Sequence, residues 1–185
     1  MGDRIVKFVT KCLWVALVLF VIRYLISNFS SVYDFFGAAG EVISVTVIIM
    51  GLYSTILWKY NPLERIPKIM GNYTGTIEYN YYGEPSKKEV AVSISQTLLS
   101  IKIQVTTNEI TSNTIIGNLV EENNEFFLYY TYITNPKSKY SSDNPIQYGT
   151  CRLSTNTKNK LMGVYWTNCR TIGDIELIKL PKQKR

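Results

Sequence analysis

An uncharged apolar run near the N-terminus limits the folds open to this chain more than any other feature. The run covers residues 12–22, and its continuation to residue 31 gives the roughly 20 residues that a helix needs to cross about 30 Å of hydrocarbon. A second run without charged residues covers residues 42–58. We therefore expect two transmembrane helices, at about 12–31 and 42–58.

A cleaved signal peptide is the main alternative for the first run, because Lys7 and Lys11 precede it. The match is poor, since Arg23 directly follows the apolar run at the place where small residues belong. We interpret the run as a retained anchor. Arg23 is expected to reach the outer membrane interface, and the alternative is a polar contact that helps the helices associate.

Basic residues flank the outer ends of the helix pair and are missing from the connection at 24–41. They are Arg4, Lys7, Lys11, Lys59, Arg65 and Lys68. Because lysine and arginine near membrane segments are retained on the cytoplasmic side, we expect both ends of the chain to be cytoplasmic. Residues 1–59 would form the transmembrane region. Residues 60–69, with Pro62 and Pro67, would form a short and fairly stiff linker.

From residue 71 onward the hydrophobic period changes to two, and β-branched and aromatic residues dominate. Eight strands are predicted, at about residues 73–79, 89–95, 99–105, 113–121, 125–134, 146–155, 161–168 and 172–180. Asn123 and Asn124 predict a tight hairpin, and residues 83–86 predict another turn.

Short connections between these strands favour an up-and-down antiparallel arrangement. Closing such a sheet removes its exposed edges, so residues 70–185 are expected to form an eight-stranded, lipocalin-like antiparallel β-barrel. The predicted fold class is a membrane-anchored all-β protein, with two N-terminal transmembrane helices followed by this barrel. A β-sandwich of the same strands is the alternative.

The composition argues against an enzyme. The chain has no histidine, which removes the commonest general base, and no glycine-rich phosphate loop opens a helix. Its three cysteines show no CxxC spacing, so we expect neither a metal nor another cofactor. Cys151 and Cys169 are expected to be free thiols, although they could be neighbours in a sheet.

The strands carry more tyrosine, tryptophan and threonine than a dry barrel core needs, which favours a binding function. Bases stack on aromatic faces and phosphates pair with guanidinium groups, so such a set would suit a nucleotide ligand. The alternative is that most aromatic residues fill or cover the barrel. Parity leaves the sixth strand open: Tyr148, Thr150 and Arg152 share one face, and either face could be interior.

The order of helices, linker and strands resembles a known family. The most specific part is Gly163-Val-Tyr-Trp-Thr167 followed by Gly173, and the opening strand Gly71-Asn-Tyr-Thr-Gly75 also fits. The chain is similar to the two-transmembrane, β-strand-rich effectors of bacterial CBASS anti-phage defence, which are associated with CD-NTase enzymes. The resemblance implies that the barrel binds a cyclic dinucleotide from a CD-NTase, and that the helices then oligomerise and disrupt the bacterial inner membrane.

The resemblance supplies no residue-level ligand motif, so candidate ligand-binding residues are chosen by strand face and chemistry. Tyr73 and Tyr165 are expected to stack on bases, Thr150 and Thr167 to donate hydrogen bonds, Arg152 to pair with a phosphate, and Arg170 to lie at the rim. The expected partners are the cyclic dinucleotide, the lipid bilayer and further copies of the chain, with no DNA or RNA polymer. A tethered barrel that binds a lipid or protein, without nucleotide signalling, is the alternative.

Overall fold

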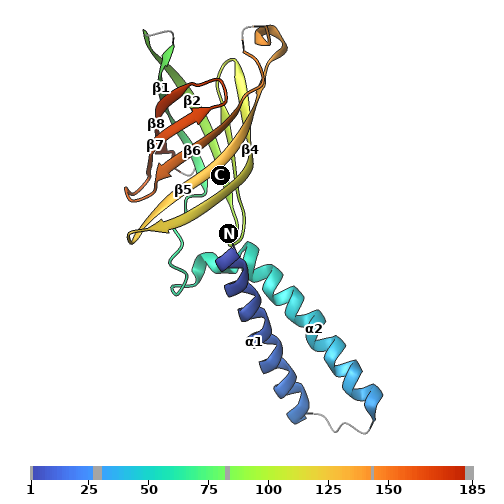
Figure 1. Cartoon of the computed structure of the whole chain (residues 1–185). Coiled ribbons are helices and arrows are strands. Elements are labelled where there is room, and N and C mark those ends of the chain that lie inside the picture. Colours follow the sequence, from blue (N-terminus) through green and yellow to red (C-terminus); the bar gives the residue numbers. More distant parts are fainter. Residues whose placement is uncertain (1, 27–30, 82–83, 143, 182–185) are drawn as a thin grey trace. The chain divides into compact units, whose positions relative to one another are not determined.

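The computed structural model describes residues 2–26, 31–81, 84–142 and 144–181, and the chain divides into two compact units. The first unit is Met1–Glu64 with Thr97–Leu99, and it contains the helices. The second is Arg65–Gln96 with Ser100–Arg185, and it contains the strands (Figure 1).

Two long helices form most of the first unit: α1, Gly2–Ile26, and α2, Val32–Thr55. Both are long and apolar enough to cross a membrane. Each begins ten residues before its predicted start, since an uncharged run marks only the apolar part of a helix. The helical backbone continues through charged residues such as Lys7 and Lys11, because lysine is a good helix former.

The start of α2 has a local cause that the hydrophobic pattern does not show. The hydroxyl group of Ser31 accepts a hydrogen bond from the backbone N–H of Asp34, and the Asp34 carboxylate accepts one from the Ser31 N–H. This capping box satisfies N–H groups at the helix terminus. Most of the predicted connection at 24–41 is therefore helical, and residues 27–30 lie outside the described part.

Polar contacts join α1 to other parts of the helical unit. Arg23 Nε donates a hydrogen bond to the carboxylate of Glu41 in α2 at 2.9 Å. Lys11 forms an ion pair with Glu64, whose carboxylate also accepts a 2.7 Å hydrogen bond from Tyr53 Oη. Arg23 thus makes the polar contact between helices that the sequence offered as an alternative.

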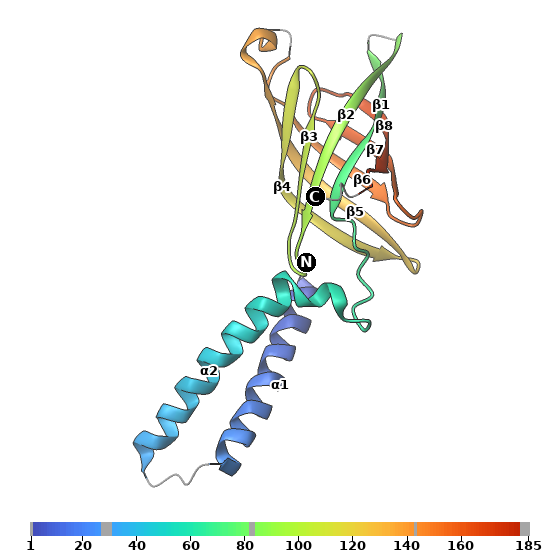
Figure 2. The ribbon, with the colours of Figure 1, turned by 180° about the vertical axis from the view of Figure 1, so that it is seen from behind.

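Eight strands form a closed antiparallel barrel in chain order, and β1 pairs with β8 to close it (Figures 1 and 2). The strands are β1 Gly71–Tyr81, β2 Glu84–Gln96, β3 Ile101–Thr106, β4 Ile110–Glu122, β5 Glu125–Pro136, β6 Tyr148–Ser154, β7 Lys160–Thr167 and β8 Ile172–Lys179. This closed barrel confirms the predicted fold class and excludes the β-sandwich alternative.

Turn residues fit the hairpins that they close. Asn123 and Asn124 both have positive φ, at 51° and 65°, as a two-residue hairpin with the twist of β4 and β5 requires. The turn predicted at 83–86 is shorter than expected, because Glu84, Pro85 and Ser86 pair with β1 as part of β2. Residue 83 lies outside the described part.

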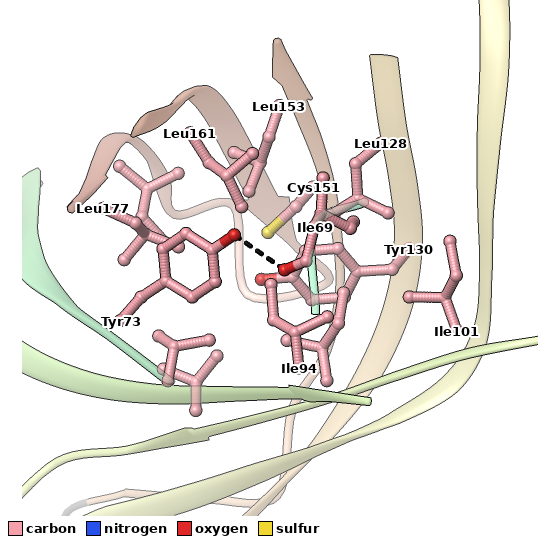
Figure 3. Close-up of a cluster of buried hydrophobic side chains, with 14 of the residues drawn as sticks. Ile69, Tyr73, Ile94, Ile101, Leu128, Tyr130, Cys151, Leu153, Leu161 and Leu177 are labelled. Atoms are coloured by element: carbon pink, nitrogen blue, oxygen red, sulfur yellow. Dashed lines mark hydrogen bonds between the residues drawn. The ribbon is translucent and has the colours of Figure 1, made fainter. Parts of the chain in front are cut away.

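The linker segment just before β1 closes one end of the barrel. Ile69 is buried, and its backbone N–H donates to the side-chain oxygen of Gln96 at 2.9 Å. Its carbonyl accepts a 2.6 Å hydrogen bond from Tyr73 Oη, drawn as a dashed line among the core side chains in Figure 3. Gln96 also donates to the carbonyl of Pro67. Residues 65–70 therefore belong with the barrel unit, in contrast to the predicted boundary at residue 70.

Candidate ligand-binding cavity

A cavity of about 580 Å³ lies inside the barrel, at the end formed by the β3–β4, β5–β6 and β7–β8 connections. Its size is within the range of small-molecule sites in proteins, about 300–1,000 Å³. Five tyrosines line it: Tyr79, Tyr130, Tyr132, Tyr140 and Tyr165. Hydroxyl and amide groups come from Thr107, Ser112, Thr134, Thr167, Thr171, Asn144 and Gln147. The lining therefore combines flat aromatic surface with hydrogen-bonding groups.

Glycines on neighbouring strands let two of these tyrosines lie close to the wall. Tyr132 pairs with Gly149, where a Cβ atom would lie only 2.3 Å from the end of the tyrosine ring. Tyr165 pairs with Gly173, where a Cβ atom would lie 2.6 Å from its ring. A larger residue at Gly149 would push the ring away, and one at Gly173 would also collide with the backbone carbonyl oxygen of Glu78, 2.4 Å away. The missing side chains therefore keep space open in the cavity.

Lys88 and Glu109 are the charged residues of the cavity lining, and they form an ion pair with each other. Lys88 Nζ donates to the Glu109 carboxylate at 2.6 Å. Burial by itself would lower the pKa of Lys88, but the hydrogen bond and the attraction of Glu109 raise it above its ordinary value. Tyr79 raises the pKa of Lys88 as well, so Lys88 supplies a positive charge that interacts with the Glu109 carboxylate and with Tyr79.

The β3–β4 connection positions Glu109. Thr107 Oγ1 accepts hydrogen bonds from the backbone N–H groups of Glu109 and Ile110, at 3.2 and 3.0 Å. The backbone N–H of Lys137 then donates to the Glu109 carbonyl at 2.9 Å. These bonds hold the carboxylate at the cavity wall without using its own oxygens, which remain available to Lys88.

Burial keeps the inner tyrosines neutral. It raises the pKa of Tyr73 to about 12 and the pKa of Tyr130 well above its ordinary value. The pKa values of Tyr132 and Tyr165 are raised for the same reason, and burial raises the pKa of the Cys151 thiol to about 12. At neutral pH these groups act as hydrogen-bond donors and packing surfaces, and they add no negative charge to the cavity.

The cavity contains two of the six residues predicted to bind ligand, Tyr165 and Thr167. Tyr73 is buried among the residues that close the other end of the barrel (Figure 3). Thr150 is turned outward, where its hydroxyl group lies 3.3 Å from that of Thr131. Arg170 is exposed in the β7–β8 turn with φ of 61°. These positions and that of Arg152 are outside the cavity lining.

Arg152 belongs to a polar and aromatic cluster on the outer face. Its Nε donates to Tyr129 Oη at 2.6 Å, and its Nη2 donates to Glu122 at 2.8 Å. The guanidinium group also lies over the Phe127 ring, 3.7 Å from its centroid. Tyr129 and Arg152 together hold the pKa of Glu122 below its ordinary value. The face of strand β6 is thereby settled: Gly149, Cys151 and Leu153 are inside.

Lys88, Glu109, Tyr140 and Asn144 line the cavity, although the sequence pattern did not predict them as binding residues. Parity could have found Lys88, because it shares the inner face with Val90, Val92 and Ile94. Tyr140 and Asn144 lie in the loop between β5 and β6, where no periodic pattern indicates which side chains turn toward the barrel.

The fold and the cavity define a class: a β-barrel that can hold one small ligand, on a chain with two apolar helices. A family model described as "Cap15, cyclic dinucleotide receptor domain" matches residues 64–179. CD-NTase-associated protein 15 of Staphylococcus schleiferi is 35% identical over 183 residues, covering 97% of this chain and 100% of that protein. The chain belongs to this Cap15 family of CD-NTase-associated proteins, as the sequence resemblance indicated.

Proposed function

We propose that the barrel binds a cyclic dinucleotide in the cavity lined by Lys88 and the five tyrosines. The observation that carries the proposal is the combination of aromatic walls with a cation at one wall of a 580 Å³ space. A cyclic dinucleotide presents two bases and two phosphates. It therefore needs flat surfaces for stacking and donors for its anionic backbone. Membership of the Cap15 family supports this class of ligand.

Within the cavity, each part of the ligand has a matching group. Tyr165 and Tyr132 offer ring faces for the bases, and Thr167 offers a hydroxyl group. Lys88 offers the charge for a phosphate, which would take the place of Glu109 as its partner. Arg152 is not part of this proposed site, because its guanidinium group is already bound on the outer face.

The proposed output of ligand binding is at the membrane. The chain would act as a non-catalytic CBASS effector in the bacterial inner membrane, with both ends cytoplasmic. Ligand binding would drive association of the transmembrane helices, disruption of the membrane and death of the infected cell. The two apolar helices and the basic residues outside them support this arrangement.

The full chain reconstituted in dye-loaded liposomes tests the function directly. Cyclic di-GMP, cyclic di-AMP and cyclic di-UMP are added in turn, and calorimetry on the same chain in detergent measures binding. We expect one probe to bind and to release dye, with no release in its absence. Binding without release would contradict the membrane-disrupting output, and release that no cyclic dinucleotide changes would favour a tethered barrel with another partner.

Membrane orientation has its own test. A fluorescent reporter that matures only in the cytoplasm is fused after Arg185, and alkaline phosphatase, which is active only in the periplasm, is fused at the same place in a second version of the chain. The excess of lysine and arginine outside the helix pair leads us to expect fluorescence and no phosphatase activity. The opposite result would place the barrel outside and exclude a cytosolic nucleotide as its ligand.

A further inference from the structure

The outer face of β7 departs from the polar pattern of a solvated sheet. Met162, Val164 and Trp166 point outward and are exposed, while Leu161 and Tyr165 of the same strand are buried inside. An antiparallel sheet with one face in water normally alternates apolar and polar residues. Strand β7 is therefore apolar on both faces.

Neighbouring strands extend this surface. Ile172 of β8 lies directly opposite Trp166, and Thr150 is the partner of Trp166 on β6, with Tyr148 two residues before it on the same outer face. Ile172 and Tyr148 are more than half exposed, at 68% and 53%. We call Tyr148, Met162, Val164, Trp166 and Ile172 the β7 outer patch. In contrast, the outer faces of β2 and β3 carry Lys87, Glu89, Ser93, Ser95, Lys102 and Gln104. A contiguous exposed apolar patch of this kind marks an interaction surface.

Charges beside the patch are arranged to fit a second copy. Arg152, Val164 and Asp174 lie in one row across β6, β7 and β8, because Val164 pairs with both of the others. Adjacent strands lie about 4.8 Å apart, so the row reads positive, apolar, negative. Consider a two-fold axis that runs parallel to β7 and lies between the outer faces of two copies. It would place Arg152 of each copy opposite Asp174 of the other. Val164 would then face Val164 on the axis.

The state of both charged groups suits such a contact. Glu122, Tyr129 and Phe127 hold the Arg152 guanidinium in one geometry, so little conformational entropy is lost when it meets a partner. Asp174 is exposed, and within the described residues it makes no side-chain hydrogen bond or ion pair.

We propose that the β7 outer patch is a two-fold contact between barrels of two copies of this chain, with Val164 on the axis and Arg152 paired to Asp174 across it. This contact rests on the proposed function, in which copies of the chain associate at the membrane, because it is the surface through which their barrels would meet. The five residues of the patch are few beside the roughly 20–30 residues a side of a standard stable interface. The contact is therefore weak in solution and becomes effective when membrane helices concentrate the chains.

Cross-linking at the axis tests the contact in the full chain in liposomes. Cys12 and Cys169 are replaced by serine, and Val164→Cys is compared with Gln104→Cys on the polar outer face of β3. Stacked sheets lie about 10 Å apart, too far for a direct disulfide at the axis, so the short thiol reagent bismaleimidoethane is used. We expect Val164→Cys to form dimers about tenfold faster or more, because the contact raises the local thiol concentration.

Charge complementation supplies the second arm. In the Val164→Cys background, Asp174→Arg alone and Arg152→Glu alone each place like charges opposite one another, and cross-linking should fall. The two variants are then mixed with different tags. In a dimer of one copy of each, both contacts again join opposite charges, so cross-linking between the two variants should recover. Recovery also shows that both variants fold.

Equal rates for Val164→Cys and Gln104→Cys, or no recovery in the mixture, would overturn the proposal and leave the patch to another protein or to lipid. The measurement is made with and without the cyclic dinucleotide that binds the wild type. If the cyclic dinucleotide binds but the cross-link does not form, only the proposed contact is wrong. If no cyclic dinucleotide binds, the proposed receptor function is wrong.

Discussion

Lys88 and Glu109 face each other across the cavity wall, with 2.6 Å between the ammonium nitrogen and a carboxylate oxygen. A carboxylate in this position imitates a phosphate oxygen, so it satisfies the lysine while the cavity holds no anion. The same carboxylate is a competitor once an anionic ligand arrives. In the proposed site, Lys88 would therefore raise the affinity for an anionic ligand and Glu109 would lower it.

Replacing the lysine should weaken binding. Lys88→Met removes a charge-assisted hydrogen bond of about 1.5–3 kcal/mol, so we expect affinity for the cyclic dinucleotide to fall roughly tenfold to hundredfold in calorimetry on the full chain. Lys87→Met is the matched control, because Lys87 is exposed on the opposite face of β2 and pairs with Glu78. Equal losses for the two variants would remove Lys88 from the site.

Glu109→Gln should have the opposite effect. The substitution keeps the shape of the side chain but removes the negative charge that competes with the ligand phosphate for Lys88. We expect tighter binding, together with a stronger dependence of affinity on salt when titrations are compared at low and high ionic strength, because the site then carries a net positive charge whose attraction for the anionic ligand is screened by salt. Weaker binding by this variant would show that Glu109 contacts the ligand itself.

Narrowing the cavity should reduce binding without unfolding the barrel. In Gly149→Ala the new methyl group collides with the far end of the Tyr132 ring, which can swing away from β6 into the cavity. Ser154→Ala, on the outer face of the same strand, serves as the control. We expect a lower affinity for the first variant alone, at similar melting temperatures. Unchanged affinity of Gly149→Ala would place the ligand elsewhere.

The barrel should lose stability in alkali. The pKa of Tyr73 is raised by burial to about 12 from the ordinary value of 10.0, so between about pH 10 and 12 the unfolded chain holds fewer protons than the folded one. The free energy of unfolding therefore falls as pH rises through this window. Tyr130, Tyr132 and Tyr165 act in the same direction.

Tyrosinate absorbance and circular dichroism, followed together in the full chain, check this expectation. The buried tyrosines should ionise only as the barrel unfolds. Ionisation of all tyrosines before any loss of structure would contradict it.

Removing one hydroxyl group should loosen the closed end of the barrel. Tyr73→Phe leaves the buried carbonyl of Ile69 without its 2.6 Å donor, at a cost of about 1–3 kcal/mol in the free energy of unfolding. Tyr148→Phe, at an exposed position, should cost little in the same denaturant titration. A Tyr73→Phe variant as stable as the wild type would mean that water or a shifted backbone replaces the bond.

Strand number, order and hairpins were predictable because each depends on local patterns. Alternation identifies a half-buried strand, and Asn123-Asn124 identifies its turn without reference to the rest of the chain. The orientation of Arg152 was not predictable in this way, since its partner Glu122 is thirty residues away on another strand. Tyr165 and Thr167, chosen by strand face and chemistry, line the cavity, whereas the four other residues chosen in the same way lie outside its lining. Lys88 was missed because it lies just before the strand predicted at 89–95, whereas β2 begins at Glu84.

The helix starts and the linker show the same limit. Hydropathy locates the apolar part of a helix but not the Ser31 cap or the charged first turns of α1. Nor does it indicate that Ile69, which follows Pro67 in the linker segment, enters the barrel core. That position is fixed by Gln96 and Tyr73, which lie far from one another in sequence.

The binding of Ile69 inside the barrel has a mechanical consequence. A pull on the chain ahead of β1 acts first on two buried hydrogen bonds, to Gln96 and from Tyr73, and on the packing of the Ile69 side chain. Only residue 70 separates Ile69 from Gly71, the first residue of β1. The strand and the segment before it must therefore move as one piece, and force applied along the chain is borne by the core itself.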